Sequence, residues 1–145
     1  MRVVLDPNVI ISALLSPSGA PARLLHVWVH GRFELIVSPL LLAELERALA
    51  YPKLRKRIAR KEAQRVITWL KDSATLANDP SEPPPVRSPD PGDDYLIALA
   101  ASEHAALVSG DEHLLGLADD FPIFSPARFL RLLDSRPRTP GTGPR

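Results

Sequence analysis

The sequence contains no cysteine, which excludes disulfide bonds, thiolate metal ligands and cysteine nucleophiles. It also lacks an apolar run long enough to cross a bilayer and the basic-then-apolar start of a secretory leader. What is present is the composition of an ordinary globular protein, with 145 residues, 45% of them hydrophobic and 24% charged. This length suits one compact domain. We therefore expect a single domain that works in the cytoplasm.

The small net charge of +1 conceals a strong separation of charge along the chain. Residues 47–71 hold nine basic side chains and one acid, Glu62, so this segment carries +8 and the rest of the chain −7. A concentrated basic stretch on an acidic protein is typical of polyanion binding. For a charge run taken alone, a solvated helix face is the more frequent explanation. The basic segment therefore gains meaning only if an acidic site lies nearby.

Apolar runs bounded by turn residues predict four strands, over residues 2–6, 33–37, 106–109 and 122–124. The predicted helices follow Asp6 and then cover residues 20–30, 38–50, the basic segment to about 73, 90–104 and 126–133. Residues 78–91, with three consecutive prolines, predict an exposed loop, and residues 135–145 a disordered tail. Strands that alternate with helices indicate an α/β fold with a parallel sheet covered on both faces.

Two acids directly follow predicted strands. Asp6 ends the first strand, and Asp111 comes after the strand at residues 106–109. In an open parallel sheet, the carboxyl ends of the strands form the ligand crevice. Taken alone, Asp6 is better explained as a helix cap, and Asp111 equally well as a turn residue after Gly110. These two acids become informative only when others join them.

Two further acids, Glu44 and Asp94, lie on helix faces that the apolar spacing turns toward the core. A buried carboxylate without a partner costs on the order of several kcal/mol, so a compensating cation is expected. For Glu44, the structural alternative is a salt bridge to an arginine. Near Asp94, Asp90 suits the helix cap, whereas Asp93 could be a cap, an auxiliary group or a ligand.

Acids that converge on one crevice repel one another unless positive charge is present. Hard oxygen ligands of this kind indicate Mg²⁺ or Mn²⁺. Such a centre supports metal-assisted hydrolysis of a phosphodiester, because it activates the attacking water and stabilises the leaving oxygen. The basic segment would bind the flanking nucleic-acid backbone. The acids and the basic segment together therefore predict a hydrolase that acts on nucleic acid.

Four segments resemble the motifs of PIN domains, in the right order and spacing: residues 4–9 (VLDPNV), 42–45 (LAEL), 90–98 (DPGDDYLIA) and 108–115 (VSGDEHLL). Each segment alone is weak, but the set is fairly specific and covers residues 1 to about 130. The sequence is most similar to the VapC-like PIN proteins, which are toxin components of toxin–antitoxin pairs.

The resemblance implies a three-layer α/β/α fold over residues 1–134, with a central, mainly parallel sheet of four to five strands. It implies an endoribonuclease that cleaves single-stranded RNA with Mg²⁺ or Mn²⁺, forms a homodimer and is inhibited by a small antitoxin in its active site. The catalytic and metal-binding residues carried over are Asp6, Glu44, Asp94 and Asp111, and the auxiliary residues are Asn8, Asp93 and Ser109. The basic side chains expected to bind RNA are Arg55, Lys56, Arg57, Arg60 and Lys61.

Two residues depart from the family pattern. Pro7 stands where the family usually has threonine or serine, and His113, expected to be a surface residue, stands where an acid is common. The main alternative is therefore a catalytically weak PIN module that binds RNA or a protein partner. A haloacid-type phosphatase would need a second aspartate at Asn8, and a receiver domain would need its acidic pair at the first strand rather than at Asp93 and Asp94.

Overall fold

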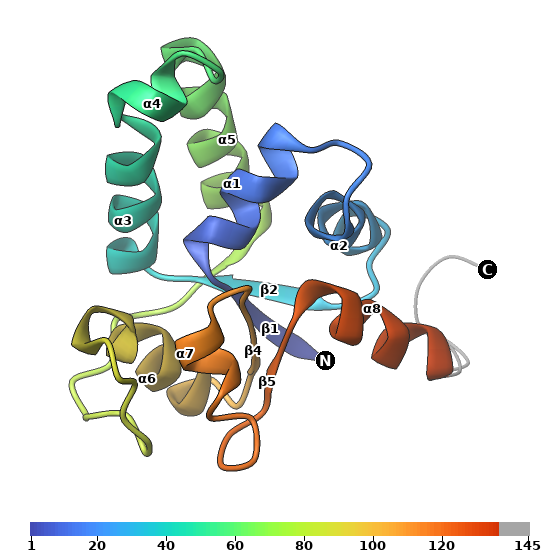
Figure 1. The fold of residues 1–145 in the computed structure, drawn as a ribbon, viewed down its shortest axis with the longest axis vertical. Coiled ribbons are helices and arrows are strands. Elements are labelled where there is room, and N and C mark those ends of the chain that lie inside the picture. The colour runs from blue at the N-terminus through green and yellow to red at the C-terminus, as the bar shows by residue number, and fades with distance from the viewer. Residues whose placement is uncertain (137–145) are drawn as a thin grey trace.

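The computed structural model describes residues 1–136 and has a five-stranded parallel sheet at its centre (Figure 1). The strands are β1 (Arg2–Leu5), β2 (Glu34–Val37), β3 (Thr75–Leu76), β4 (Ala106–Val108) and β5 (Ile123–Phe124). Their order across the sheet is β3-β2-β1-β4-β5, and each neighbouring pair is parallel. The predicted parallel sheet is confirmed. Sequence reasoning missed β3 because two residues are too few to show an alternating pattern.

The helices are α1 (Pro7–Leu15), α2 (Ala20–Val29), α3 (Pro39–Leu49), α4 (Pro52–Arg55), α5 (Arg60–Ser73), the 3₁₀ turn η1 (Pro91–Asp93), α6 (Asp94–Ser102), α7 (Glu112–Leu115) and α8 (Pro126–Ser135). The predicted loop is confirmed, since residues 78–90 form no helix or strand. The predicted disordered tail is wrong for Ser135, which completes α8, and residues 137–145 lie outside the described part. Within residues 1–136, no helix is both long and apolar enough to span a membrane.

Several helices begin at a polar cap followed by proline. The Ser38 hydroxyl accepts a hydrogen bond from the Leu41 amide at 3.2 Å, and Ser125 does the same for Arg128 at 3.2 Å. Proline suits the first turn because its missing N–H would have no partner there. These two serine–proline pairs therefore mark where the chain leaves β2 and β5 and turns into α3 and α8.

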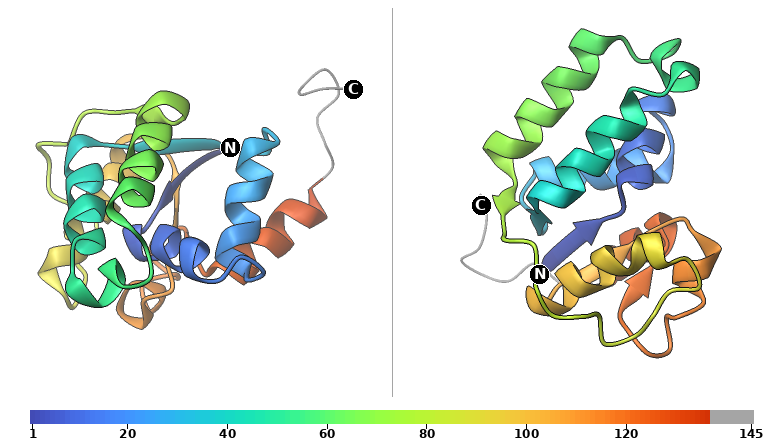
Figure 2. Two further views of the ribbon diagram at one scale, coloured as in Figure 1. Left: turned by 90° about the horizontal axis from the view of Figure 1, so that it is seen from above. Right: turned by 90° about the vertical axis from the view of Figure 1, so that its left-hand side faces the viewer.

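The helices form layers on both sides of the sheet (Figures 1 and 2). Helices α1, α2, α3 and α5 lie on one side of the strands, and α6 and α7 lie on the other. Helix α8 packs beside α2, and Phe129 of α8 meets Phe33 edge-on at 5.8 Å between ring centroids. The arrangement is a three-layer α/β/α fold.

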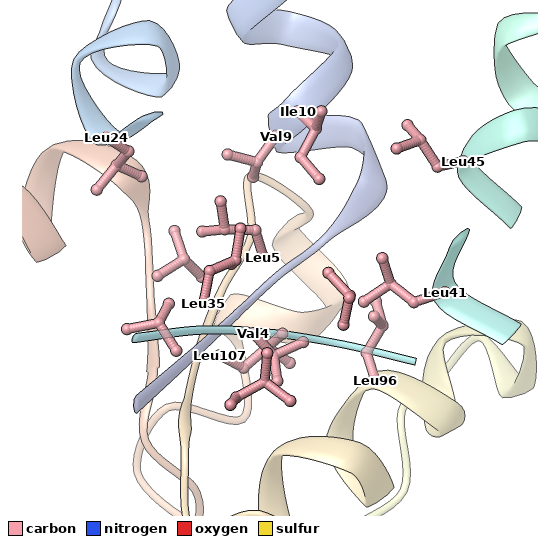
Figure 3. Close-up of a cluster of buried hydrophobic side chains, with 14 of the residues drawn as sticks. Val4, Leu5, Val9, Ile10, Leu24, Leu35, Leu41, Leu45, Leu96 and Leu107 are labelled. Atoms are coloured by element: carbon pink, nitrogen blue, oxygen red, sulfur yellow. The ribbon is translucent and has the colours of Figure 1, made fainter. Parts of the chain in front are cut away.

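The core lies between the sheet and these helices (Figure 3). Strand side chains Val4 and Leu35 pack in the same cluster as Leu45 of α3 and Leu96 of α6. All four are at most 1% exposed. Burial of this kind contributes roughly 25 cal/mol per Å² of apolar surface, so the core holds the ends of β1 and β4 in a fixed relation.

Candidate functional site

Asp6 is a buried carboxylate at the carboxyl end of the central strand β1. Its side chain is 3% exposed. The Asn8 amide donates to Oδ1 at 3.0 Å, which makes Asp6 the cap of α1, and the Ser109 hydroxyl donates to Oδ2 at 2.8 Å. Burial raises the pKa of Asp6, the hydrogen bonds from Asn8 and Ser109 lower it, and the nearby Asp111 raises it further.

Ser109 ties the ends of β1 and β4 together. The register pairs Leu5 with Val108, so the next residues, Asp6 and Ser109, emerge side by side. The fully buried Ser109 hydroxyl donates to Asp6 and accepts a hydrogen bond from the Asp111 amide at 3.0 Å. Asp111 in turn caps α7 by accepting the His113 amide at 2.8 Å. The structure thus brings Asp6, Ser109 and Asp111 together.

Asp93 is the third acid of this cluster. The pKa of Asp93 is raised to about 6, and burial is the largest cause. The smaller causes are repulsion from Asp6 and Asp111, a hydrogen bond with the Asp111 side chain, and repulsion from Asp90. When both carboxyls are ionised, neither can donate that bond. In the structure, the Oδ2 atom of Asp93 is buried and has no hydrogen-bond partner among residues 1–136. A buried carboxylate oxygen without a donor is costly unless a cation or a proton meets it.

Asp94 turns away from this cluster toward the proline-rich loop. Its Oδ1 accepts the Ser88 amide at 2.8 Å, and its Oδ2 accepts the Arg87 guanidinium at 3.2 Å. The side chain of Asp94 is 14% exposed, whereas that of Arg87 is 69% exposed. Asp94 therefore anchors the end of the loop to the start of α6.

Glu44 lies at the edge of the apolar stripe of α3. Its side chain is 32% exposed and forms an ion pair with Arg47 one turn later. Sequence reasoning turned Arg47 toward solvent and Glu44 toward the core. That expectation is confirmed for Arg47, whose side chain is 66% exposed, and wrong for Glu44, which is only half-buried and already has an arginine partner. The alternative of an arginine salt bridge describes the structure better.

Tyr95, which the sequence did not single out, lies close enough to Glu44, Asp6 and Asp93 to be affected by their charges. Burial raises the pKa of its phenol, and the charges of Asp6, Glu44 and Asp93 raise it further. The phenol therefore stays protonated beside the acids and can donate a hydrogen bond to an anionic ligand. An aromatic residue at helical spacing is usually a core residue, which is why no pattern in the sequence identified it.

A hollow of about 350 Å³ adjoins the cluster on the side of α1. Its lining includes Asn8, Ser12, Pro21, Gly110, Asp111 and Pro126. The side chains of Asn8 and Ser12 are exposed, and only the backbone amide of Asn8 serves Asp6. The two residues that depart from the family pattern leave the hollow intact, since Pro7 is buried in the first turn of α1 and His113 is exposed, as expected.

The donor set is compatible with a hard divalent cation. It consists of carboxylate oxygens, and Asp93 contributes one that is buried without a partner. Among residues 1–136, no three acid or imidazole side chains already converge closely enough to enclose an ion. A cation would therefore draw the carboxylates together and relieve their mutual repulsion.

The basic side chains predicted to bind RNA lie away from the acids. They occupy α4, the turn after it and the start of α5, at the far end of α3 from the sheet (Figure 1). The eleven residues of α3 span about 16 Å. Arg55 is half-buried, whereas the other four are exposed: Lys56, Arg57, Arg60 and Lys61.

Comparisons with known proteins agree with this fold. The uncharacterized protein MJ1680 of Methanocaldococcus jannaschii is 29% identical over 121 residues, which cover 83% of this chain and 77% of that protein. PAE2754 of Pyrobaculum aerophilum superposes with a TM-score of 0.62 at 16% identity, over 94% of this chain and 91% of that one.

Two solved toxin–antitoxin structures have the same fold. VapBC2 of Rickettsia felis, solved bound to a DNA fragment from their promoter, superposes with a TM-score of 0.59 at 14% identity. FitAcB of Neisseria gonorrhoeae gives 0.56 at 20% identity. Each alignment covers 86% of this chain and 98% of the other. The model of the PIN domain matches residues 2–113, so the chain belongs to the PIN domain family.

Proposed function

We propose that this protein is a Mg²⁺- or Mn²⁺-dependent endoribonuclease that cleaves single-stranded RNA and serves as the toxin of a toxin–antitoxin pair. Membership of the PIN family supports nuclease activity. The observation that carries the proposal is the cluster that the buried Asp6 forms with the partly exposed Asp93 and Asp111, in which one buried oxygen of Asp93 has no hydrogen-bond partner among the described residues. Such a cluster is costly to fold and is useful mainly when a cation completes it.

In this proposal, Asp6, Asp93 and Asp111 hold the metal, and Glu44 completes the set. Asp94, which also ranked among the predicted ligands, holds the loop through Ser88. When bound, the divalent cation polarises the phosphodiester and acidifies the attacking water.

The protein's own groups would orient the substrate. Ser109 keeps the carboxylate of Asp6 in place through the bond at Oδ2. The neutral phenol of Tyr95 can donate to a phosphate oxygen, and Asn8 and Ser12 line the hollow into which the neighbouring nucleotide would extend. Asp6 is itself only 3% exposed, so its carboxylate is shielded from bulk water.

The proposal extends to the partners and the setting. The basic segment would bind the RNA backbone, as its charge suggests. The protein would work in the cytoplasm as a homodimer, and a small antitoxin would inhibit it. The VapBC2 and FitAcB structures, which share the fold, support a partner of this kind.

A cleavage assay with paired variants tests this function. Purified protein is incubated with diverse single-stranded RNAs and Mn²⁺, with and without EDTA. We expect cleavage that EDTA abolishes and that Asp6→Asn and Asp93→Asn lower by about 100-fold or more, because loss of a group that only orients a metal ligand already costs roughly 10–100-fold. Asp94→Asn should retain more activity than either. If the wild type cleaves every RNA no faster than Asp6→Asn does, the proposal is contradicted. If the wild type binds RNA but does not cleave it, the protein is instead the catalytically weak module.

A further inference from the structure

A second hollow, of about 510 Å³, lies between α3 and α5 and is rich in positive charge. Three cations line it, Arg55, Arg60 and Lys71, together with one acid, Glu46. None of these four side chains forms an ion pair within the described part of the chain. The lining of the hollow therefore carries an excess of two positive charges, which no ion pair within residues 1–136 neutralises.

The hollow holds an arginine that is partly buried without a partner. The Nε atom of Arg55 is inaccessible to solvent and has no hydrogen-bond partner among residues 1–136. A guanidinium N–H in this position costs free energy unless an acceptor reaches it. Gln64 and Thr68 line the same hollow and add polar groups that can donate to an anion.

This hollow lies on a different flank of α3 from the carboxylate cluster. Glu46 lines the hollow, whereas Glu44 lies near Tyr95, whose phenol also feels the charges of Asp6 and Asp93. Residues two apart on a helix point about 200° away from each other. The buried face of α3, which includes Leu41 and Leu45, separates the two flanks. A ligand in the basic hollow therefore cannot be the same phosphate that would bind at the acids in the proposed function.

We propose that the α3–α5 hollow is a phosphate-binding site, distinct from the carboxylate cluster, and that it takes a backbone phosphate of a bound RNA strand. Arginine, lysine, threonine and glutamine are among the side chains that contact nucleic-acid phosphates. The arginine fork matches a phosphate through two parallel hydrogen bonds. The identity of RNA as the ligand rests on the proposed function, but the binding of phosphate does not.

The surrounding charge favours an extended polyanion over a single small anion. Lys56, Arg57 and Lys61 are exposed beside the hollow, on the turn after α4 and at the start of α5. A strand that leaves the hollow would meet these exposed cations at the end of the α3–α5 pair, where α4 connects the two helices (Figure 2). The hollow would then hold the RNA at a distance from the point of cleavage.

The test measures binding in EDTA, so that it is independent of cleavage. Fluorescence anisotropy gives the affinity of a long single-stranded RNA for the wild type and for Arg55→Gln/Arg60→Gln/Lys71→Gln. The matched control, Arg23→Gln/Arg128→Gln/Arg131→Gln, removes the same charge from exposed positions on α2 and α8. We expect the hollow variant to bind at least about ten-fold more weakly than the control, with a shallower salt dependence.

A second variant covers the case in which the triple substitution unfolds the chain. Gln64→Glu keeps the size of an exposed side chain and puts a negative charge into the hollow. It should weaken RNA binding as well, and circular dichroism should show an unchanged fold. If both Gln64→Glu and the triple variant bind RNA as the control does, and phosphate does not bind either, the proposal is overturned.

Nuclear magnetic resonance distinguishes the possible sources of the phosphate. Inorganic phosphate and a nucleoside monophosphate should shift the backbone amide signals of Gln64 and Thr68 in the wild type. Inorganic phosphate and the nucleoside monophosphate could both shift these signals while the triple variant of the hollow binds RNA as tightly as the control does. That result would support the site and assign it to a small phosphorylated ligand. Shifts with a polyglutamate peptide but not with phosphate would overturn the proposal in favour of an acidic protein partner. If the wild-type protein cleaves no RNA but the binding results are as expected, the proposed function is contradicted and the phosphate site is still supported.

Discussion

Replacement of Asp93 by asparagine is expected to stabilise the metal-free protein even as it removes activity. The Asp93 carboxyl has a pKa of about 6 in the folded protein and 3.8 ordinarily. At pH 8, this difference corresponds to roughly 3 kcal/mol of penalty for the ionised native state. Because Asp93 is partly exposed, we reduce the expected gain in the free energy of unfolding to about 1–2 kcal/mol.

The pH dependence of this gain follows from the direction of the pKa change. A carboxyl with a raised pKa in the folded state costs nothing while both states are protonated. The cost grows as the pH rises above 3.8 and is complete above about 6. Asp93→Asn should therefore exceed the wild type in stability at pH 8, and the difference should fade toward pH 4.

Urea denaturation in EDTA, followed by circular dichroism, measures the effect. Asp94→Asn is the matched control. It should lose about 1–2 kcal/mol at pH 8, because Asp94 accepts hydrogen bonds from Ser88 and Arg87. Mn²⁺ should stabilise the wild type but not Asp93→Asn. Destabilisation by Asp93→Asn at pH 8, or a gain that does not vary with pH, would refute the reasoning.

Three further substitutions test other contacts. Ser109→Ala should lower the free energy of unfolding by about 1–3 kcal/mol, since it leaves the buried Oδ2 of Asp6 without its donor; urea denaturation would show this. Gly110→Leu should leave the thermal midpoint unchanged, because nothing lies within 4 Å of the added Cβ. The leucine should fill the hollow lined by Asn8 and Asp111 and lower RNA cleavage about ten-fold or more. Unchanged cleavage of every RNA would exclude that hollow as a substrate path. Ser38→Ala should cost about 1 kcal/mol through loss of the α3 cap with little change in cleavage, and an unaltered denaturation midpoint would contradict the role of that cap.

The sequence was informative wherever a short apolar run ended at a polar residue. The runs before Asp6 and Ser109 predicted β1 and β4, and the rule that ligands bind at the carboxyl ends of parallel strands brought Asp6 and Asp111 together. Proline after a small polar residue likewise predicted the start of α3 at Ser38. These features depend on local order along the chain, so a single sequence contains them.

The positions of the helical acids were harder to predict because they depend on the exact turn of the helix. A spacing of 3.6 residues turned Asp94 inward with Ile97. The helix in fact begins with the 3₁₀ turn Pro91–Asp93, which has three residues per turn and brings Asp93 to the cluster. For Glu44, the helical period placed the side chain beside the apolar face of α3. It did not show that Arg47, three residues later, would form an ion pair with Glu44. The ion pairs that long, flexible side chains form do not follow from the periodicity of the sequence.

The anchoring of the proline-rich loop at Asp94 has a consequence for how this protein tolerates change. Only the last residues of the loop, Arg87 and Ser88, are held to the start of α6. Insertions or an epitope tag between residues 80 and 85 would lengthen the connection without shifting Asp93, since the anchor follows them in the chain. Deletion of Ser88 would shift the contact between the loop and Asp94 and would move Asp93 away from its position in the carboxylate cluster. The loop can therefore be a variable surface attached to an invariant centre.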